Sequence, residues 1–292
     1  MDRLDHSPLN GGMTNTNTTL VIGSTGKTGK RVTARLVGLG HDVRHGSRSS
    51  ATPFDWEAPD TWAPALAGVT AAYVAYSPDL AAPGSHEAIT ELTRLAKAAG
   101  LERLVLLSGR GEEEAQRAEA VVRDSGLEWT IIRATWFAQN FSEGSFADDV
   151  KAGSVALPVG DVLEPFVDAD DIADVAVAAL TDDRHLGQTY ELTGPRLLSF
   201  ADAIAEISSA TGRVIDFQTV PMDDYAAVLA DYQVPPAEVD LLRFLFSTVL
   251  DGRNSSLADG VQRALGREPK DFMDFARDVA AAGGWGLSSA PE

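Results

Sequence analysis

Three glycines with the spacing G-x-x-G-x-x-G, namely Gly23, Gly26 and Gly29, follow a short apolar run and precede a helix-like pattern. Alone, this spacing fits a structural turn as well as a ligand site, but the order strand, glycine turn, helix favours a dinucleotide site. Gly23 allows a tight turn, Gly26 lets backbone approach a pyrophosphate, and Gly29 lets the helix pack closely on the strand. The helix N-terminus offers free N–H groups to the phosphates. The residues expected to bind them are Gly23, Ser24, Thr25, Gly26, Lys27, Thr28 and Gly29.

Basic residues are concentrated beside this motif. The chain carries a formal net charge of −19, which argues against non-specific binding to nucleic acid or to an anionic membrane. Residues 27–48 nevertheless hold one acidic residue, Asp42, and six basic ones: Lys27, Lys30, Arg31, Arg35, Arg44 and Arg48. This local excess predicts a small bound polyanion, although Lys30 and Arg35 would also fit a solvated helix face.

Arg48 indicates which dinucleotide is bound. It lies 19 positions past Gly29, about where NAD sites carry an acidic residue for the ribose hydroxyls. The sequence there is Ser47-Arg48-Ser49-Ser50, and Asp42 falls at the wrong end of the strand. An arginine among hydroxyl groups suits a 2′-phosphate, so we expect NADP(H). Asp55 either accepts a hydrogen bond from the adenine amino group or caps the next helix.

Apolar runs alternate with helical patterns through the first half of the chain. This alternation predicts an α/β fold, a Rossmann-type doubly wound parallel sheet with right-handed crossovers. The expected strands are 18–22, 41–46, 54–56, 69–75, 103–108 and 129–133, and helices are expected from Lys27, near 60–67, from Ser85 and from Glu112. The cofactor then lies in loops 23–28, 46–50, 75–78 and 108–111.

Three residues of these loops are further candidates for the cofactor site: Ala75, Tyr76 and Ser108. Tyr76 either flanks the nicotinamide or is a surface residue. Ser108 either hydrogen-bonds substrate or ribose, or caps the next turn. Tyr76 and Ser108 are also the only, weak, candidates for catalysis.

The pattern changes after residue 134. A helix is expected over Thr135–Val150, short strands over 155–157 and 164–167, a helix over 170–179, a strand over 189–192, and mostly helices after Ser199. We expect a disordered tail (1–17), an NAD(P)-binding domain (18–150 with returning segments near 165–192), and a smaller, mostly helical α/β substrate lobe (151–292). The substrate candidates are Trp136, Phe137, Gln139, Asn140 and Phe166, although core packing also explains Phe137 and Phe141.

The fold and the glycine spacing resemble the short-chain dehydrogenase/reductase superfamily. Within it the chain resembles the NmrA-like, atypical extended branch, and most closely the group named after an ergot-alkaloid biosynthesis dehydrogenase. The matching segments are Gly23–Gly29, the Arg48 loop, Phe54–Trp56, Leu106–Gly109, Ser125–Arg133, Trp136–Phe141 and Gly266–Arg277. The resemblance implies an NAD(P)(H) cofactor in either an NADPH-dependent reductase or a non-catalytic redox sensor.

The superfamily's Tyr-x-x-x-Lys proton donor is missing from the sequence. The residues four positions after the five tyrosines are Ser77, Leu80, Gly194, Leu229 and Pro236, and Ala115-Gln116-Arg117 occupies the region where isoflavone-reductase relatives place a lysine. Reducing a ketone needs a proton or an oxyanion site, whereas an iminium becomes a neutral amine on taking hydride. Reduction of an iminium or imine is therefore the first expectation, with quinone or enone reduction close behind. Glu164 and Asp168 are candidate acids, and Asp168 or Asp170 also suits a helix N-cap.

Composition narrows the remaining possibilities. The chain has no cysteine, so disulfides, thiol nucleophiles and thiolate metal sites are excluded. Its five histidines are scattered without ligand spacing, so no metal is expected. The sequence shows neither a transmembrane run nor a signal peptide. We expect a cytoplasmic protein with a small-molecule substrate and no nucleic-acid or membrane partner, either a monomer or a homodimer.

Overall fold

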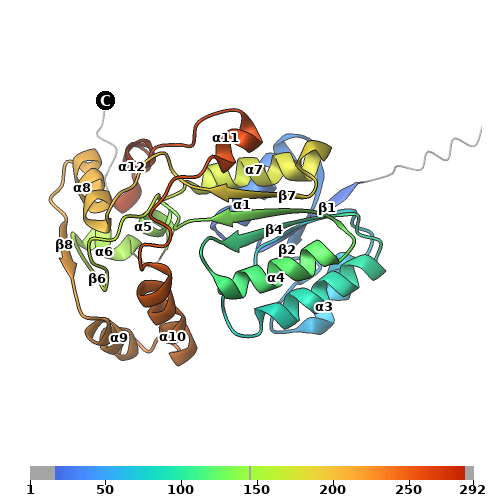
Figure 1. Ribbon diagram of the computed structural model, residues 1–292, viewed down its shortest axis with the longest axis horizontal. Coiled ribbons are helices and arrows are strands. Elements are labelled where there is room, and N and C mark those ends of the chain that lie inside the picture. Colours follow the sequence, from blue (N-terminus) through green and yellow to red (C-terminus); the bar gives the residue numbers. More distant parts are fainter. Residues whose placement is uncertain (1–16, 145, 287–292) are drawn as a thin grey trace, which may run out of the picture.

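The computed structural model, which describes residues 17–144 and 146–286, is built around a six-stranded sheet (Figure 1). The strand order is β2-β1-β3-β4-β5-β7, and every neighbouring pair is parallel. All six carboxyl ends therefore meet at one edge, and the order reverses between β1 and β3, where such sheets bind ligands. The strands are β1 (Thr18–Ile22), β2 (Asp42–Gly46), β3 (Ala71–Val74), β4 (Arg103–Gly109), β5 (Glu128–Ala134) and β7 (Gln188–Leu192).

Helices cover both faces of the sheet. Successive side chains of β1 point to opposite faces, so Leu20 and Ile22 pack in one cluster and Val21 in the other. The first cluster is closed by α2 (Trp62–Leu66), α3 (Ser85–Ala98) and α4 (Glu113–Asp124), and the second by α1 (Lys27–Gly38), α7 (Ala169–Thr181) and α11 (Gly260–Leu265). Burial on both faces explains the near-continuous apolar strands and confirms the predicted doubly wound fold.

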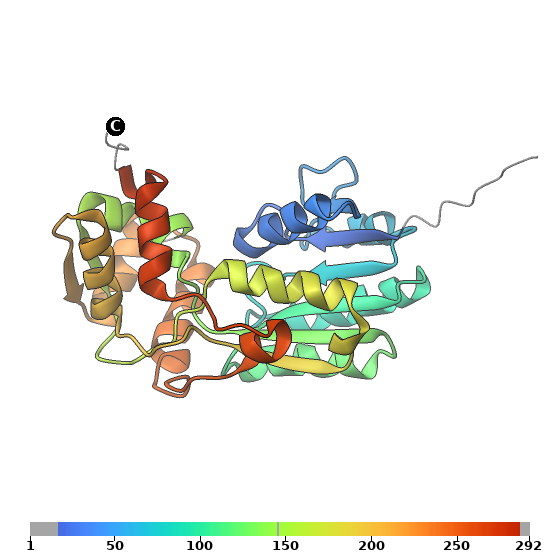
Figure 2. The same ribbon diagram turned by 90° about the horizontal axis from the view of Figure 1, so that it is seen from above.

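A third apolar cluster forms the core of a second, mostly helical part of the molecule (Figures 1 and 2). Phe141, Phe146 and Phe200 lie at its centre. Its elements are α5 (Asn140–Glu143), α6 (Ala147–Ala152), β6 (Ser154–Leu157), α8 (Phe200–Thr211), β8 (Asp216–Thr219), α9 (Met222–Asp231), α10 (Pro236–Phe244), the π-helical turn Leu245–Val249 and α12 (Phe272–Ala281). β6 and β8 form a small parallel sheet.

The chain crosses between the two parts several times. Segment 135–139 leads out of β5, 163–168 leads back into α7, and 193–199 leaves β7 for the second part. These segments hydrogen-bond to one another: Val167 N donates to Trp136 O (2.9 Å), and Glu164 and Leu198 exchange two backbone bonds (2.9 and 3.1 Å). Segments 135–139, 163–168 and 193–199 are thus hydrogen-bonded to one another beside the carboxyl edge of the sheet, and together they are called the junction.

Four predictions about elements were wrong or incomplete. Residues 54–56 form no strand, because Phe54, Trp56 and Trp62 pack together as an aromatic group in a loop. The helix expected over 135–150 is two short helices, α5 and α6, preceded by the crossing segment. Segment 164–167 forms isolated bridges instead of a strand, and the largely exposed β8 was missed.

In the described part of the chain, we find no helix with both the length and the apolar character needed to cross a bilayer.

Candidate cofactor and substrate site

The glycine turn has the geometry that a dinucleotide loop needs. Gly23 adopts φ +78° and its N–H donates to Gly46 O (2.9 Å), which ties the turn to the end of β2. A Cβ at Gly29 would overlap the carbonyl group of Gly23, so α1 approaches β1 as closely as only glycine allows. A Cβ at Gly26, by contrast, would come no nearer than 3.3 Å to Gly23 O. The close approach at Gly29 confirms its predicted packing role, and Gly26 leaves open space above the turn.

The start of α1 fits an anion. Its N-cap, Gly26, makes no side-chain cap bond, and the first turn carries no acidic residue. Ser24 Oγ is buried without a hydrogen-bond partner among the described residues. Lys27 is the first residue of α1, and burial lowers the pKa of its ammonium group, opposed by Glu143. Unsatisfied N–H donors, an orphaned hydroxyl and a lysine at a helix N-terminus are what a pyrophosphate would satisfy. Thr25 is exposed beside them, and the buried Thr28 hydroxyl accepts a bond from Tyr73 (2.9 Å).

The loop after β2 leaves Arg48 free. Ser47 and Ser50 hydrogen-bond to each other (2.7 Å), and Phe54 N donates to Ser47 O (3.0 Å), which folds the loop into a compact turn. Arg48 is exposed, and no residue in the described ranges pairs with its guanidinium. Since Gly46 bonds to the glycine turn, this cation is held next to the candidate phosphate site.

Most of the neighbouring basic residues are paired, so the local excess of positive charge is smaller in the structure than in the sequence. Lys30 and Arg31 pair with Glu143 (2.6 Å each). Arg35 pairs with Asp170 (2.7 Å) and Asp174 (2.6 Å). Arg44 donates to the carbonyl groups of residues 65 and 67. Acids from distant segments thus neutralise much of the positive charge of this basic run. Of its six basic residues, Lys27 and Arg48 are the two whose side chains form no ion pair and no hydrogen bond to a carbonyl group with a described residue.

Aromatic residues border the turn on the β3 side. Tyr76 is half-buried, with its ring 4.7 Å from that of Trp56, whose indole N–H donates to Ala75 O (3.3 Å). Burial, and then Glu87 and Glu57, raise the pKa of Tyr76, so its phenol is neutral at physiological pH. Asp55 does not cap a helix: its carboxylate accepts from Glu57 N (3.1 Å). Its proposed contact with adenine remains a prediction.

The side chain of Ser108 is hydrogen-bonded within a buried cluster of ion pairs. It is buried, and its hydroxyl donates to Glu119 (2.7 Å) on α4. Glu119 in turn binds Arg133 (2.7 Å) and Arg123 (2.8 Å). Ser108 therefore neither caps the next turn nor presents a free hydroxyl to a ligand in this structure.

Two of the substrate candidates belong to the interior. Gln139 is buried, donating to Asp168 (2.8 Å) and accepting from Ala169 N (2.7 Å). Phe166 is 2% exposed within the aromatic core of the second part. Asp168 accepts from Asp170 N (2.7 Å) and is thus the N-cap of α7.

The other three substrate candidates keep some exposure. Trp136 is half-buried against Phe146, Phe200 and Phe246 (5.3–6.2 Å between ring centroids). Phe137 is half-buried against the α1–α7 side of the sheet. Asn140 is half-buried at the start of α5, and its side chain has no hydrogen-bond partner within the described ranges. These residues follow directly from the end of β5, the position expected of a substrate wall.

Buried carboxyl groups lie close to the same edge. Glu164, in the junction, is 1% exposed and accepts a long bond from Trp136 N (3.4 Å). Burial raises its pKa to about 7, opposed by that bond and by Arg110. Glu112, just after β4, faces Asp79, just after β3, and burial raises the pKa of both, that of Glu112 to about 9. Glu164 was a sequence candidate. The Asp79–Glu112 pair was missed because nothing in either local sequence indicates the other residue.

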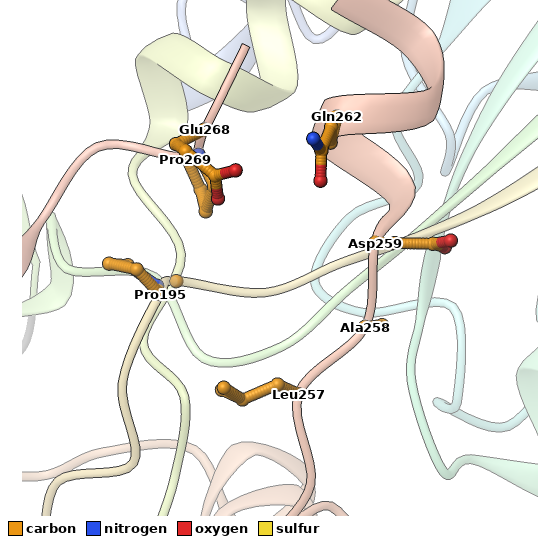
Figure 3. Close-up of a pocket in the computed structure, with 8 residues that line it drawn as sticks. Pro195, Leu257, Ala258, Asp259, Gln262, Glu268 and Pro269 are labelled. Atoms are coloured by element: carbon orange, nitrogen blue, oxygen red, sulfur yellow. The ribbon is translucent and has the colours of Figure 1, made fainter. Parts of the chain in front are cut away.

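A separate cavity lies beyond the end of β7 (Figure 3). Its volume is about 450 Å³, and it is lined by Gly194, Pro195, Leu257, Ala258, Asp259, Gln262, Glu268 and Pro269. None of these residues was predicted to bind cofactor or substrate, and none lies in the glycine turn.

Comparisons with known sequences agree with this geometry. A model of the NAD(P)H-binding family matches residues 23–183, more than half of the chain. Festuclavine dehydrogenase of Aspergillus fumigatus is 30% identical over 290 residues, which cover 90% of this chain and 98% of that protein. The (4-alkanoyl-5-oxo-2,5-dihydrofuran-3-yl)methyl phosphate reductase of Streptomyces griseus is likewise 30% identical, over 90% of this chain and 98% of that protein.

Solved structures share the fold. The NADPH-dependent quinone oxidoreductase of Escherichia coli, complexed with NADPH, has a TM-score of 0.74 at 19% identity, over 89% of this chain and 99% of that chain. NmrA, a negative transcriptional regulator in complex with NAD, has a TM-score of 0.69 at 16% identity, over 95% and 100%. Together with the family match, these findings confirm the predicted fold and family resemblance. The chain therefore belongs to the NAD(P)H-binding family and is an NAD(P)H-dependent oxidoreductase with ergot-alkaloid-type relatives and the same fold as NmrA.

Proposed function

We propose that the protein is an NADPH-dependent reductase that reduces an electron-poor small molecule, either an iminium or imine, or a quinone or conjugated enone. The observation that carries the proposal is Arg48, which pairs with no described residue, beside an α1 N-terminus that has neither a side-chain cap nor an acidic residue in its first turn. A cation next to a pyrophosphate-binding turn suits the 2′-phosphate that distinguishes NADPH from NADH. Bound NADPH supplies the hydride, and the chain supplies binding, orientation and electrostatics.

The residues divide this work between two sides of the sheet edge. The N–H groups at the start of α1, with Ser24 and Lys27, hold the pyrophosphate. Arg48 holds the 2′-phosphate, and Asp55 and Tyr76 border the adenosine and nicotinamide ends. Trp136 and Asn140, on the far side of the edge, present a flat apolar surface and an amide to the substrate. Holding the acceptor in line with the hydride contributes to rate by itself.

The tyrosines support an acceptor other than a simple ketone. Tyr73 is hydrogen-bonded to Thr28, Tyr190 contacts His185, Tyr225 meets Phe246 edge-on, and Tyr232 is 80% exposed. The fifth, Tyr76, packs on Trp56. In the described part of the chain, none pairs with a lysine that would lower its pKa. The Streptomyces relative is named for an unsaturated lactone carrying an alkanoyl group, and the Escherichia coli structure for quinone reduction, which favours conjugated acceptors.

The test is oxidation of NADPH, with NADH in parallel, against cyclic imines and iminium ions, quinones, enones and simple ketones. We expect turnover with at least one conjugated or charged acceptor class, faster with NADPH. Turnover of simple ketones alone would contradict the proposed acceptor class. Tight NADPH binding without turnover of any acceptor would favour the alternative, a non-catalytic NADP(H) sensor.

A further inference from the structure

We propose that the carboxyl groups of Asp79 and Glu112 hold one proton between them and deliver it to the reduced substrate at the ends of β3 and β4. The pair would supply the acid that the missing Tyr-x-x-x-Lys motif supplies elsewhere. This inference rests on the proposed reductase function and names the proton source for acceptors that need one.

The fold brings the two residues together at the predicted site. β3 and β4 are parallel neighbours, with Val74 opposite Leu106, so the loops that follow them leave the same edge of the sheet. Asp79 follows Tyr76 in the first loop, and Glu112 ends the second loop as the N-cap of α4. Loops 75–78 and 108–111, which end one residue before Asp79 and Glu112, are two of the four loops expected to hold the cofactor.

Gly109 directs the Glu112 side chain back toward this edge. A Cβ at residue 109 would overlap the carboxyl group of Glu112. The acid therefore occupies the space that a side chain at the end of β4 would fill. Position 109 follows Ser108, whose own hydroxyl is turned away to Glu119, so Glu112 provides the polar group at this point of the edge.

Two facing carboxyl groups require a proton. Glu112 is 7% exposed, and its Oε2 has no hydrogen-bond donor among the described residues. A carboxylate only accepts hydrogen bonds, so Asp79 and Glu112 bond to each other only when one is protonated. The acids facing Glu112 are Asp79, from the β3–α3 loop, and Glu119, from α4. Arg253, a cation whose side chain lies beside Gly111, is bonded to Asp251 and to Gly111 O.

Burial is the main cause that raises the pKa of Glu112 to about 9, and Asp79 and Glu119 raise it further. Asp79 is half-buried and accepts a bond from Ala81 N (2.8 Å), and its carboxylate accepts a hydrogen bond from the protonated carboxyl group of Glu112. Glu112 is therefore a neutral acid at physiological pH. Because Asp79 is partly exposed, it connects the pair to solvent.

The hydride of NADPH would add to the electrophilic carbon of an enone or quinone, and the displaced π-electron pair would move to the carbonyl oxygen. That oxygen takes the proton of Glu112, which becomes a carboxylate, and a solvent proton returns to it through Asp79. An N-alkylated iminium ion takes the same hydride but becomes a neutral amine and needs no proton. Turnover of the enone therefore depends on both the hydride and the proton, whereas turnover of the iminium ion depends on the hydride alone.

The experiment compares E112Q with wild type on one enone and one N-alkylated iminium ion. The matched control is E113Q, which makes the same Glu-to-Gln replacement at the exposed start of α4. General acids contribute about 10²–10⁴-fold, so we expect enone turnover by E112Q to fall about 10²-fold while iminium turnover changes less than about threefold. An equal loss on both acceptors would overturn the proposal, because it would indicate a structural role. A selective enone loss in E164Q, with E112Q unaffected, would assign the proton to Glu164 instead.

The pH profile supplies a further criterion. Wild-type enone turnover should fall above about pH 9, as Glu112 loses its proton. D79N removes a neighbouring negative charge and should move this fall to lower pH, whereas iminium turnover should show no such inflection in either protein. If the inflection in the pH profile of enone turnover stays at the same pH in D79N, the proposal that Asp79 and Glu112 share a proton is refuted.

A cofactor-free measurement separates this inference from the proposed function. The infrared spectrum of the protein alone, at neutral pH, should contain a protonated carboxyl band that E112Q lacks and that wild type loses near pH 9. If that band titrates with Glu112 but no acceptor is turned over, the carboxyl pair stands and the reductase function fails. If acceptors are turned over but E112Q leaves the band unchanged, the pair is refuted and the function stands.

Discussion

Gly26 and Gly29 lie three residues apart in one turn, yet their surroundings differ. A side chain at Gly29 is predicted to lower stability, and one at Gly26 to weaken cofactor binding. A Cβ at Gly29 would overlap the backbone of Gly23, whereas a Cβ at Gly26 would meet only Gly23 O at 3.3 Å. We expect G29A to lower the free energy of unfolding by about 1–3 kcal/mol, a typical cost of overpacking. G26A should keep its stability to within roughly 0.5 kcal/mol but bind NADPH at least about tenfold more weakly, because the methyl group fills the space over the turn. Denaturant unfolding and titration of cofactor fluorescence measure the two effects. Similar stability losses in both variants would contradict this assignment.

The side chain of Arg48 is predicted to determine the preference for NADPH over NADH. Arg48→Ala should weaken NADPH binding by roughly 10–100-fold, the worth of one hydrogen-bonded charge, and leave NADH binding nearly unchanged. Arg94→Ala, on the exposed face of α3, is the control, because among the described residues Arg94 pairs with Glu91 alone, one turn away. Dissociation constants for both cofactors are the measurement. Equal losses for NADPH and NADH would refute the 2′-phosphate contact.

Sequence reasoning succeeded with residues whose role is set by neighbours a few positions away. The spacing of the glycines gave their packing roles, because a turn and the helix after it are local. It failed for Ser108 and Gln139, which are fixed by Glu119 and Asp168, and for Phe166, which lies in a core assembled from distant helices. The direction in which a side chain points depends on partners that only the folded chain brings near.

Helices α1, α5 and α7 are joined by one group of ion pairs: Lys30 and Arg31 bind Glu143, and Arg31 and Arg35 bind Asp170. Burial raises the pKa of Glu143, but bonds from Arg31 and Lys30 outweigh it and lower that pKa to about 2. A carboxyl group with a lowered folded-state pKa stabilises the protein above its unfolded pKa, and this stabilisation is lost as the pH falls toward 2.

Glu143→Gln should therefore reduce the free energy of unfolding by roughly 1 kcal/mol at pH 7. The difference from wild type should shrink between about pH 5 and pH 2. Urea unfolding over this pH range measures it. Asp148→Asn is a matched control on α6, because its side chain is 91% exposed and the ion pair it forms in the described part of the chain is with Lys151 of the same helix. A loss that does not change with pH would show that Glu143 acts through packing.

Elements with a strong local signal were predicted and those formed by distant contacts were not. The apolar strands β1 and β3–β5 are covered on both faces, so their composition alone identifies them. Residues 54–56 have strand-like composition, but Trp62 draws Phe54 and Trp56 into an aromatic group instead. Segment 135–150 has a helix-like pattern, but the backbone of Trp136 and Ala138 bonds to Val167. Tertiary contacts override local preference in both places.

At the scale of the whole molecule, the net charge of −19 opposes an anionic cofactor. The acids that pair with the basic residues of α1 remove most of the local excess that would offset this repulsion. Salt screens repulsion between charges separated by more than about 8–10 Å. The association rate of NADPH should therefore rise, by less than about tenfold, as salt increases from low to roughly 0.3 M. Stopped-flow fluorescence measures the rate. A rate that falls with salt would show that a positive field steers the cofactor.

The late position of β7 in the chain affects how the protein is made. The strand that borders β5 follows α5, α6, β6 and α7, so the ribosome completes β5 well before β7 leaves the exit tunnel. At roughly 5–20 residues per second, β5 then waits several seconds as an unpaired strand edge, which is a template for pairing with other chains. During this interval the nascent protein has the glycine turn of the cofactor site, but its sheet still lacks β7. Chaperone binding during synthesis should be concentrated between the emergence of β5 and that of β7.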